Sequence, residues 1–479
     1  MKIHISQVII WFVKTMGIMT IFLLALAIKL MAQANQNKPL IIDESSKKWS
    51  VLSTIKIDKV WAGHPVGFFL LTHENRQYIA YYNSERKMVV GQRDLRDKKF
   101  SLHVMPPTSR ETHGGTSTVV GWDSHNSIVI GIDKEGYIHL SGNMHVHPIT
   151  YFRSAKPYDI TTLEQVMEMT GKNEKRCTYP KFMHSREGEL IFHYRDGSSG
   201  NGNEIYNIWS CEKKQWSRLL EDPLTDGQGL MNAYQSQPVL LADGRYHVYW
   251  VWRDTPHCET NHDLSYMTSP DLINWHNPWG EKITLPATLE NKSLIVDPIP
   301  VKGGIINLAA RLCLDENNRP LFVYHKYDEN GNLQLYVAWQ EDNQWKNKVI
   351  TQWGHRWEFS GTGSINFDVR IKSFKRRPDG YYEIEYDHIK YGDGAILLDK
   401  DLNNCGKVIK PAPFGKGLQP EGDFPGLSVR IMNDQGAMEE NRTRYVLKWE
   451  TLGRNRDKPR EKPWPAPSQL YLYKLGLIK

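Results

Sequence analysis

Two histidines, a tyrosine and an arginine occur in short polar segments that separate apolar runs of this chain. They are His125, His145, Tyr179 and Arg195, the last directly before a stretch rich in Gly, Ser and Asn. Histidine and tyrosine can act as general acids and bases, and the planar arginine fork binds a carboxylate through two parallel hydrogen bonds. This set favours removal of a proton from a carbon next to a carboxylate, which is the chemistry of a lyase acting on an acidic polysaccharide.

Each of these residues also has a structural interpretation. His125 lies in a polar turn and could cap backbone groups, while His145 has histidine neighbours and could be solvated or bind a metal. Tyr179 could be a packed aromatic residue, and Arg195 could form a plain ion pair with Asp196. The catalytic interpretation therefore requires the four residues to meet in space.

The N-terminal segment predicts export of the protein. A basic start, an apolar run over residues 18–28 and the small-residue pattern Ala32-Gln33-Ala34 are typical of a secretory signal peptide spanning residues 1–34. The alternative is an uncleaved anchor. No later run is long enough to span a bilayer, so we expect a secreted or periplasmic protein that makes no membrane contact after cleavage, with one catalytic domain over residues 35–479.

The composition indicates which classes of molecule the protein binds. The net charge of +6 is spread along the chain, which suits attraction of an anionic polymer and does not indicate nucleic-acid binding. The basic cluster over residues 454–462 is interpreted as a solvated loop. Five cysteines are too few and too scattered for a disulfide framework, although one or two bridges could form. We expect a monomer.

Short strands divided by turns dominate the pattern along the chain. Predicted strands cover residues 190–194, 246–252, 321–324 and 381–386, each after a turn signal. One short helix is predicted over residues 161–170. Recurring β-units over several hundred residues favour a β-propeller, with a jelly roll or a β-helix as alternatives. The segment 269–275 is either a degenerate Asp-box turn of a propeller blade or an ordinary Ser-Pro-Asp turn.

The strand before Arg195 alternates in a way that predicts the direction of its side chains. Leu190, Phe192 and Tyr194 should share one face of this strand, with His193 and Arg195 on the other. Arg195 falls at the strand end, where binding residues of a propeller mouth are found.

Several motifs together resemble a known family. They are Asp123-Ser124-His125-Asn126, Gly136-Tyr137-Ile138-His139, Gly142-Asn143-Met144-His145, Thr178-Tyr179-Pro180, the run from Tyr194 to Gly202, Asn232-Ala233-Tyr234, Trp252-Arg253 and the run from Asn261 to Tyr266. The pattern resembles the BNR-repeat-containing lyases, and among these the ulvan lyases of polysaccharide lyase family twenty-five, with family twenty-four more distant.

The resemblance implies a fold, a reaction and a site. It implies an all-β, seven-bladed β-propeller and endolytic β-elimination in ulvan, a sulfated anionic polysaccharide, between rhamnose 3-sulfate and glucuronic or iduronic acid. His125 and Tyr179 match proton-transfer positions, and Arg195 and His145 match positions that neutralise the uronate carboxylate. The residues expected to bind substrate are Asn126, Tyr234, Arg253 and Asn201.

No cofactor is expected to be required for catalysis, but a structural zinc site is a further hypothesis. Its candidate ligands are His257, Cys258, His262 and Cys313, because Cys and His sets suit zinc. Two other functions stay open. One is a rhamnosidase-like glycoside hydrolase, which would need two facing carboxylic acids. The other is a non-catalytic carbohydrate-binding propeller.

Overall fold

The computed structural model describes residues 39–108, 111–112, 115–412, 414–415, 418–436 and 443–478. The predicted signal peptide at residues 1–34 lies outside the described residues. In the described part of the chain the elements are strands apart from three short 3-10 helices, η1 (Ile160–Thr162), η2 (Cys258–Thr260) and η3 (Lys292–Leu294). The prediction of an all-β protein is confirmed. None of the helices described is long and apolar enough to cross a bilayer.

The strands form consecutive antiparallel sheets of mostly four strands. The first two are β3 (Phe69–His73), β4 (Arg76–Tyr82), β5 (Met88–Asp94) and β6 (Ser101–Val104), then β9 (Ile128–Ile132), β10 (Ile138–Gly142), β12 (Tyr151–Ser154) and β13 (Leu163–Gln165). A small ribbon, β7 (Glu111–Thr112) and β8 (Gly115–Thr116), lies between them in sequence.

A 10-stranded sheet follows. Its first half contains β11 (His145–His147), β14 (Cys177–His184), β15 (Leu190–Ser198), β16 (Asn201–Ser210) and β17 (Gln215–Arg218). Its second half contains β18 (Asn232–Gln235), β19 (Val239–Leu240), β20 (Tyr246–Arg253), β21 (Asn261–Ser269) and β22 (Ile295–Asp297). The halves join through one parallel pair, Gly202 with Asn232.

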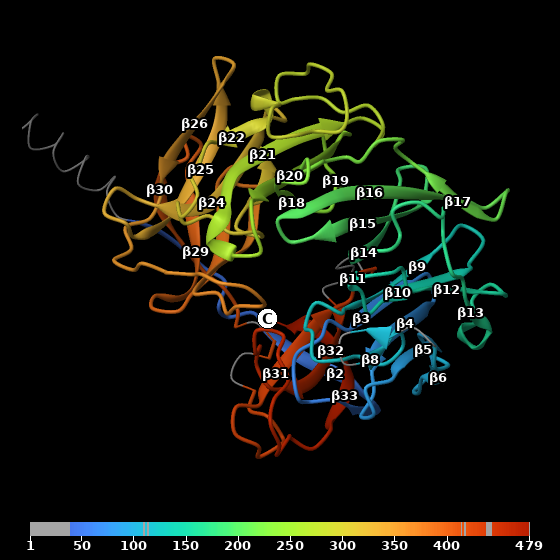
Figure 1. Cartoon of the computed structure of the whole chain (residues 1–479). Helices are drawn as coiled ribbons and strands as arrows, with labels where there is room; N and C mark the ends of the chain where they lie inside the picture. The colour runs from blue at the N-terminus through green and yellow to red at the C-terminus, as the bar shows by residue number, and fades with distance from the viewer. Residues whose placement is uncertain are drawn as a thin grey trace, which may run out of the picture.

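Three further sheets complete the fold. They are β23 (Arg311–Leu314), β24 (Pro320–Tyr327), β25 (Leu333–Glu341) and β26 (Gln344–Val349); then β27 (Val369–Arg376), β28 (Tyr382–His388), β29 (Gly392–Leu398) and β30 (Asn404–Ile409), with β1 (Leu40–Asp43) parallel to β30; and finally β31 (Ser428–Asn433), β32 (Thr443–Thr451), β33 (Ser468–Ile478) and β2 (Lys48–Val60). Figure 1 shows the sheets following one another around a common centre.

The last sheet unites the two ends of the chain. The second strand, β2, pairs antiparallel with the C-terminal strand β33 from Lys48–Ile478 to Val60–Ser468, and Figure 1 shows blue β2 beside red β33. Leu470 and Leu472 of β33 are buried in a core that also contains residues of β4, β5, β9 and β10. Packing between neighbouring sheets therefore fixes the positions of both ends.

The strand that carries Arg195 alternates as predicted. Leu190, Phe192 and Tyr194 of β15 lie in one apolar core, while Ile191 belongs to the core on the other face. The predicted strands at 190–194, 246–252, 321–324 and 381–386 correspond to β15, β20, β24 and β28. Asp271 accepts hydrogen bonds from the backbone of Ile273 and Asn274 and fixes the turn at 269–275.

The helix predicted over residues 161–170 is wrong. The chain forms the 3-10 turn η1, in which the Asp159 side chain accepts from the Thr161 backbone, and then becomes β13. Residues of β13 pair with β12, for example Ser154 with Leu163. Met167, part of the apolar stripe that suggested a helix, is 65% exposed. Pairing with an adjacent strand, which no local pattern reports, overrides the short helical periodicity.

Replacing Leu472 by Ala should reveal how much the sheet formed by both chain ends stabilises the fold. This side chain is 1% exposed in β33, and truncation of a buried leucine costs about 2–5 kcal/mol of unfolding free energy. Chemical denaturation measures the difference. Leu52→Ala on β2 is the matched control, because Leu52 is 53% exposed and should change stability by about 0.5 kcal/mol or less. Equal losses in both variants would contradict the assigned packing.

Candidate active site

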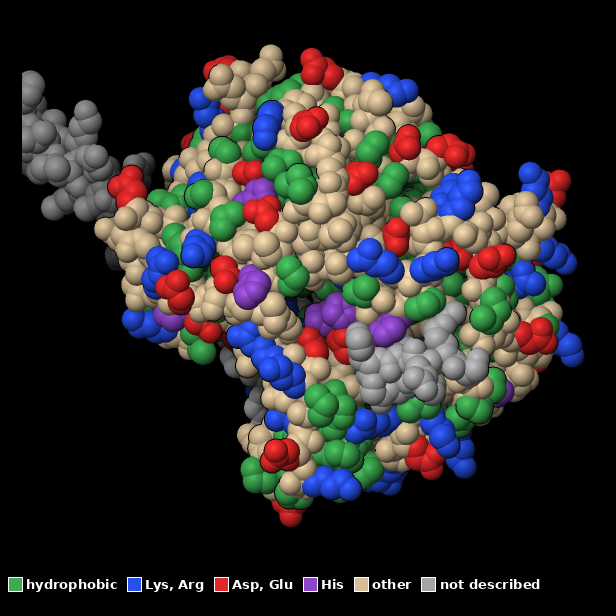
Figure 2. Space-filling model, viewed as in Figure 1, with side chains coloured by type: hydrophobic (Ala, Val, Ile, Leu, Met, Phe, Trp, Pro, Cys, Tyr) green, Lys and Arg blue, Asp and Glu red, His purple; other side chains and the backbone are tan. Residues whose placement is uncertain are grey.

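The four residues singled out in the sequence meet at one place. The ring centroids of His125 and His145 are 4.3 Å apart, and that of Tyr179 lies 6.0 Å from His125 and 6.3 Å from His145. The Arg195 guanidinium carbon lies 4.9 Å from the centre of the Tyr179 ring. They come from the loop before β9, from β11, from β14 and from β15. Figure 2 shows histidine side chains together in a hollow of the surface.

Asp123 connects the two histidines. Its Oδ1 bonds Nδ1 of His125 at 2.8 Å and also accepts the His125 backbone N–H, while its Oδ2 bonds Nδ1 of His145. The Asp123 carboxylate is buried, yet the hydrogen bonds and charges of both histidines hold its pKa well below its usual range. A single carboxylate therefore orients both imidazole rings.

The pKa values of the two histidines are shifted in opposite directions. Burial disfavours the imidazolium of His125, but an ionised Tyr179 and the hydrogen bonds and charges of Asp123 and Asp457 outweigh burial and raise the pKa of His125 well above its ordinary value. Burial lowers the pKa of His145, and the positive charges of His125 and Arg195 add to this effect against the opposing Asp123. His125 is therefore the more basic and His145 the less basic of the two rings.

Tyr179 is positioned by an irregularity in its strand. The pairing of β14 with β15 shifts register between Thr178 and Lys181, and Tyr179 has a φ of 57°, which is strained for a non-glycine residue. Bulges of this kind turn a side chain out of the regular alternation. Here the phenol is directed to the histidine pair.

Arg195 is a buried cation. It is 1% exposed, and among the described residues none of its three side-chain nitrogens forms a hydrogen bond of good geometry, although it interacts with the Tyr234 hydroxyl. The ion pair with Asp196 that the sequence left open is not formed, since Asp196 accepts instead from Asn173. Glu204 is opposite Arg195 on β16. Burial raises the pKa of Glu204 to about 7, against the lowering effect of Arg195 and Lys181.

Tyr234 and Arg253 belong to the same cluster. The Tyr234 hydroxyl bonds Ser199 at 2.7 Å and accepts from Arg253 Nη1 at 3.2 Å. Its ring lies 6.4 Å from that of Tyr179. Burial raises the pKa of Tyr179 although His125 and Arg195 oppose it, whereas the charges of Arg195 and Arg253 outweigh burial and lower the pKa of Tyr234. The two phenols therefore have opposite acid–base tendencies.

The other predicted substrate-binding residues lie at the edge of the cluster. Asn126 follows His125, and its buried side-chain amide has no hydrogen-bond partner among the described residues. Asn201 is exposed at the turn between β15 and β16, where it pairs with Ser198. Asn126 is thus next to the reacting groups, and Asn201 is open to solvent.

A distant loop supplies a residue that the sequence did not indicate. Asp457 Oδ2 lies 3.3 Å from Nδ1 of His125, and Asp457 also accepts from Ser124 and from Ser364. Residues 454–462 form a largely exposed loop, as predicted, and Asp457 is the part of it that contacts the histidine pair. The Ser124–Asp457 contact joins positions 333 residues apart, and no local pattern could have identified it.

The four predicted zinc ligands do not come together. His262 bonds Asp254 and Asp263 through its two ring nitrogens, and His257 is paired with Glu259. Cys258 and Cys313 are buried in an apolar core, where burial raises the pKa of each thiol. In the part of the chain that the structure describes, Asp123, His125 and His145 are the group with ligand atoms within 4.8 Å of one another. All five cysteines are unbridged.

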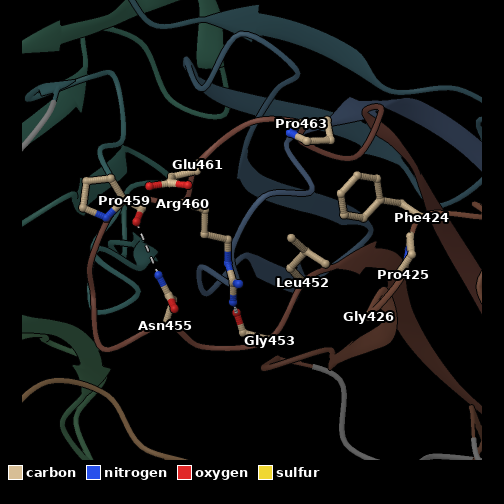
Figure 3. A pocket seen from close by; sticks show the side chains of 10 residues that line it. All are labelled: Phe424, Pro425, Gly426, Leu452, Gly453, Asn455, Pro459, Arg460, Glu461 and Pro463. Carbon is tan, nitrogen blue, oxygen red and sulfur yellow. Dashed lines mark hydrogen bonds between the residues drawn. The ribbon is translucent and has the colours of Figure 1, made fainter.

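The C-terminal loop also borders a pocket, but this pocket is separate from the cluster. It has a volume of about 600 Å³ and is lined on one side by Phe424 and Pro425 and on the other by Asn455 and Arg460. Figure 3 shows Arg460 directed at Gly453, whose carbonyl accepts from Arg460 Nη2 at 3.0 Å. None of His125, His145, Tyr179 or Arg195 lines it.

The arrangement of these side chains suits proton transfer next to a negatively charged group of a bound molecule. A neutral histidine whose Nδ1 donates to a carboxylate has its Nε2 free to accept a proton. An adjacent imidazolium and two buried arginines supply positive charge in a region of low dielectric, where it acts strongly. The carboxylates that contact the histidines, Asp123 and Asp457, are both paired, which leaves Glu204 as an unpaired acid opposite Arg195 in the described structure, where a glycoside hydrolase needs two.

The all-β fold and this site agree with the family to which the chain belongs. Residues 76–353 match the sequence profile of the BNR repeat-containing family, and the chain is a member of that family. The match covers the sheets from β4 to β26 and all residues of the cluster except Asp457.

Known relatives confirm the resemblance to ulvan lyases. The chain is 25% identical over 228 residues to the short isoform of an ulvan lyase from Alteromonas sp. (strain LOR), covering 37% of this chain and 43% of that protein. It therefore spans less than half the length of this relative. The crystal structure of polysaccharide lyase Uly1 superimposes with a TM-score of 0.59 at 15% identity, over 89% of this chain and 99% of that one. A PL25 ulvan lyase bound to -[GlcA(1-4)Rha3S]- gives a TM-score of 0.55 at 13% identity, over 88% and 96% of the two chains.

Replacing Asp123 by Asn should lower the pKa of His125. The folded-state pKa is raised above the ordinary 6.5, so the charged pair stabilises the fold fully below pH 6.5 and loses that effect as the pH rises through the folded-state pKa. Without the carboxylate this extra stability shrinks. Histidine titration by NMR measures the pKa directly.

Asp133→Asn is the matched control, because Asp133 pairs with His139 in a different part of the core. It should leave the titration of His125 unchanged. An unchanged His125 pKa in Asp123→Asn would contradict the bridging role of Asp123.

Proposed function

We propose that this protein is a polysaccharide lyase that cleaves ulvan by β-elimination. The observation that carries the proposal is the convergence of His125, His145 and Tyr179 on one point, with both histidines bonded to Asp123. Similarity to ulvan lyases and to a structure bound to -[GlcA(1-4)Rha3S]- supports this substrate. The proposed cut lies between rhamnose 3-sulfate and glucuronic or iduronic acid, is endolytic, and leaves an unsaturated uronyl end.

The protonation states assign roles that differ in part from those implied by the resemblance. Neutral His145, oriented by Asp123, is the proposed base that takes the proton at C5 of the uronate. Tyr179, whose pKa is raised by burial, is the proposed acid that protonates the leaving O4. Cationic His125 neutralises the carboxylate, which the resemblance assigned to His145.

Arg195 supports this charge from behind the two tyrosines. Its guanidinium lies 4.9 Å from the Tyr179 ring centre and 5.7 Å from that of Tyr234. Because Arg195 is 1% exposed, its fork is covered in the described structure, and its positive charge stabilises the developing negative charge across the rings. A non-catalytic binding propeller would not require a histidine pair of unequal protonation.

We further propose that the sheets form seven blades of a β-propeller. Division of the 10-stranded sheet at the Gly202–Asn232 pair gives two blades, and each of the other five large sheets gives one. The blade made from β31, β32, β33 and β2 would close the ring, since it unites both chain ends. A secreted or periplasmic location is also proposed, because a polymeric substrate is met outside the cytoplasm.

Tyr179→Phe and His145→Ala should each lower kcat on ulvan by about 10²–10⁴-fold, the usual contribution of a positioned acid or base. Oligosaccharide binding should persist, because these groups act mainly in the transition state. Ultraviolet absorbance of the unsaturated product measures the rate, and calorimetry measures binding.

Tyr391→Phe is the matched control, since this exposed tyrosine accepts only a backbone N–H from Gly354 within the described contacts, and it should retain wild-type turnover. Wild-type protein that binds ulvan without forming unsaturated ends would overturn the lyase and favour a binding propeller. Saturated reducing ends would instead favour a hydrolase.

A further inference from the structure

Three tryptophans surround one arginine next to the loops of the active site. The guanidinium carbon of Arg86 lies 4.1 Å from the ring centre of Trp61, 4.6 Å from that of Trp122 and 5.3 Å from that of Trp464. Each pair of indole rings meets edge to face, with centroids 5.4 to 5.6 Å apart. These four side chains form an arginine cage.

Two of the three indoles belong to the loops that carry the carboxylates of the site. Trp122 directly precedes Asp123 in the loop before β9, the Asp123 loop. Trp464 lies with Asp457 in the loop between β32 and β33, the Asp457 loop. Oxygens of the two carboxylates lie 2.8 Å and 3.3 Å from Nδ1 of His125. The arginine cage is therefore a second place at which the two loops meet.

The turn that carries Arg86 is bonded to the Asp123 loop through its backbone. Arg86 lies between β4 and β5 with a φ of 64°, a conformation that is costly for a residue other than glycine. Its carbonyl accepts from the backbone N–H of Val120 at 3.0 Å. At the end of β4, the Tyr82 hydroxyl donates to the carbonyl of Asn126 at 2.8 Å. This end of β4 thus contacts the Asp123 loop on both sides of its carboxylate.

The indole faces are the main surroundings of the Arg86 cation. Arg86 forms no ion pair with a carboxylate of the described residues, and the face of tryptophan is the aromatic surface that attracts a cation most strongly.

The neighbouring His64 adds no second charge to the arginine cage. Trp61 Nε1 donates to Nδ1 of His64 at 2.9 Å, and because an indole nitrogen can only donate, this ring nitrogen carries no proton. Burial and the charge of Arg86 lower the pKa of His64 to about 4, although Asp123 and Asp457 oppose this effect. His64 is therefore neutral at neutral pH and does not repel Arg86.

We propose that Arg86 is a positioning residue that holds the Asp123 loop and the Asp457 loop together, so that both carboxylates reach His125. The consequence for catalysis rests on the proposed function. Arg86 acts through the indoles of the two loops: one cation attracts both rings, and this shared contact fixes the distance between the loops. Without the cation the indoles lose their common partner, and the carboxylates are no longer held on the same imidazole.

The kinetic test compares removal of the cation with its conservative replacement. Arg86→Gln should lower kcat on ulvan by about tenfold to 10²-fold, the scale for misplacing a catalytic group by a distant change, with little change in KM. Arg86→Lys keeps a cation between the rings and should recover most of the lost kcat. Arg76→Gln is the matched control, because Arg76 lies 4.5 Å over the Tyr158 ring at the opposite end of β4, and it should behave as wild type.

A second measurement does not depend on cleavage. Histidine titration by NMR should show that the pKa of His125, raised in the wild type, falls towards 6.5 in Arg86→Gln, because carboxylates that move away favour the imidazolium less. Loss of the Arg86 charge alone would raise this pKa, so a fall reports the movement of the carboxylates. Arg86→Lys and Arg76→Gln should leave the pKa of His125 unchanged.

Two outcomes would overturn the positioning role. One is an unchanged or raised pKa of His125 in Arg86→Gln, and the other is an equal loss of kcat in Arg86→Gln and Arg86→Lys, which indicates a general structural role. Thermal unfolding checks the fold of each variant, and Trp464→Leu, which opens the arginine cage from the Asp457 loop, should lower the same pKa if Arg86→Gln does not fold. A wild type that leaves ulvan uncleaved would contradict the proposed function, whereas the NMR result would still decide the role of Arg86.

Discussion

The carboxylate of Asp123 is the group on which the arrangement of the site depends. Each of its oxygens bonds one histidine, so one buried negative charge fixes two rings whose centroids are 4.3 Å apart. Two protonated histidines this close would repel each other, and in agreement with this the pKa of His125 is raised while that of His145 is lowered. Two identical side chains thereby acquire different roles. His125 is suited to donate a proton or to supply positive charge, and His145 is suited to accept a proton.

The buried arginines complete this balance. Arg195 would be costly to bury without compensation, and here Glu204 and the rings of Tyr179 and Tyr234 offset part of that cost. The same positive charge acts on the two phenols unequally, because Tyr234 also bonds Arg253 whereas Tyr179 is more deeply desolvated. The charged and phenolic side chains of the site therefore come from four strands, β14, β15, β18 and β20.

Long-range contacts connect the catalytic cluster to the rest of the fold. Asp457 bonds Ser124 before β9 and Ser364 before β27, and Arg454 and Arg456 bond carbonyl groups of the segment before β27. The loop that carries them leads into β33, which pairs with β2. Correct assembly of the two chain ends thus positions a side chain that contacts His125.

The sequence by itself determined the residue types that can move protons, the short alternating strands and the side chains on each face of β15, because two-residue periodicity and turn residues act locally. Resemblance in the motifs indicated that His125, His145, Tyr179 and Arg195 belong together. Only the tertiary structure decided that Asp457 joins them, that residues 163–165 pair as a strand and that the four predicted zinc ligands stay apart. Each of these depends on contacts between segments distant in the chain, and the free energy of such contacts has no signature in local composition or periodicity.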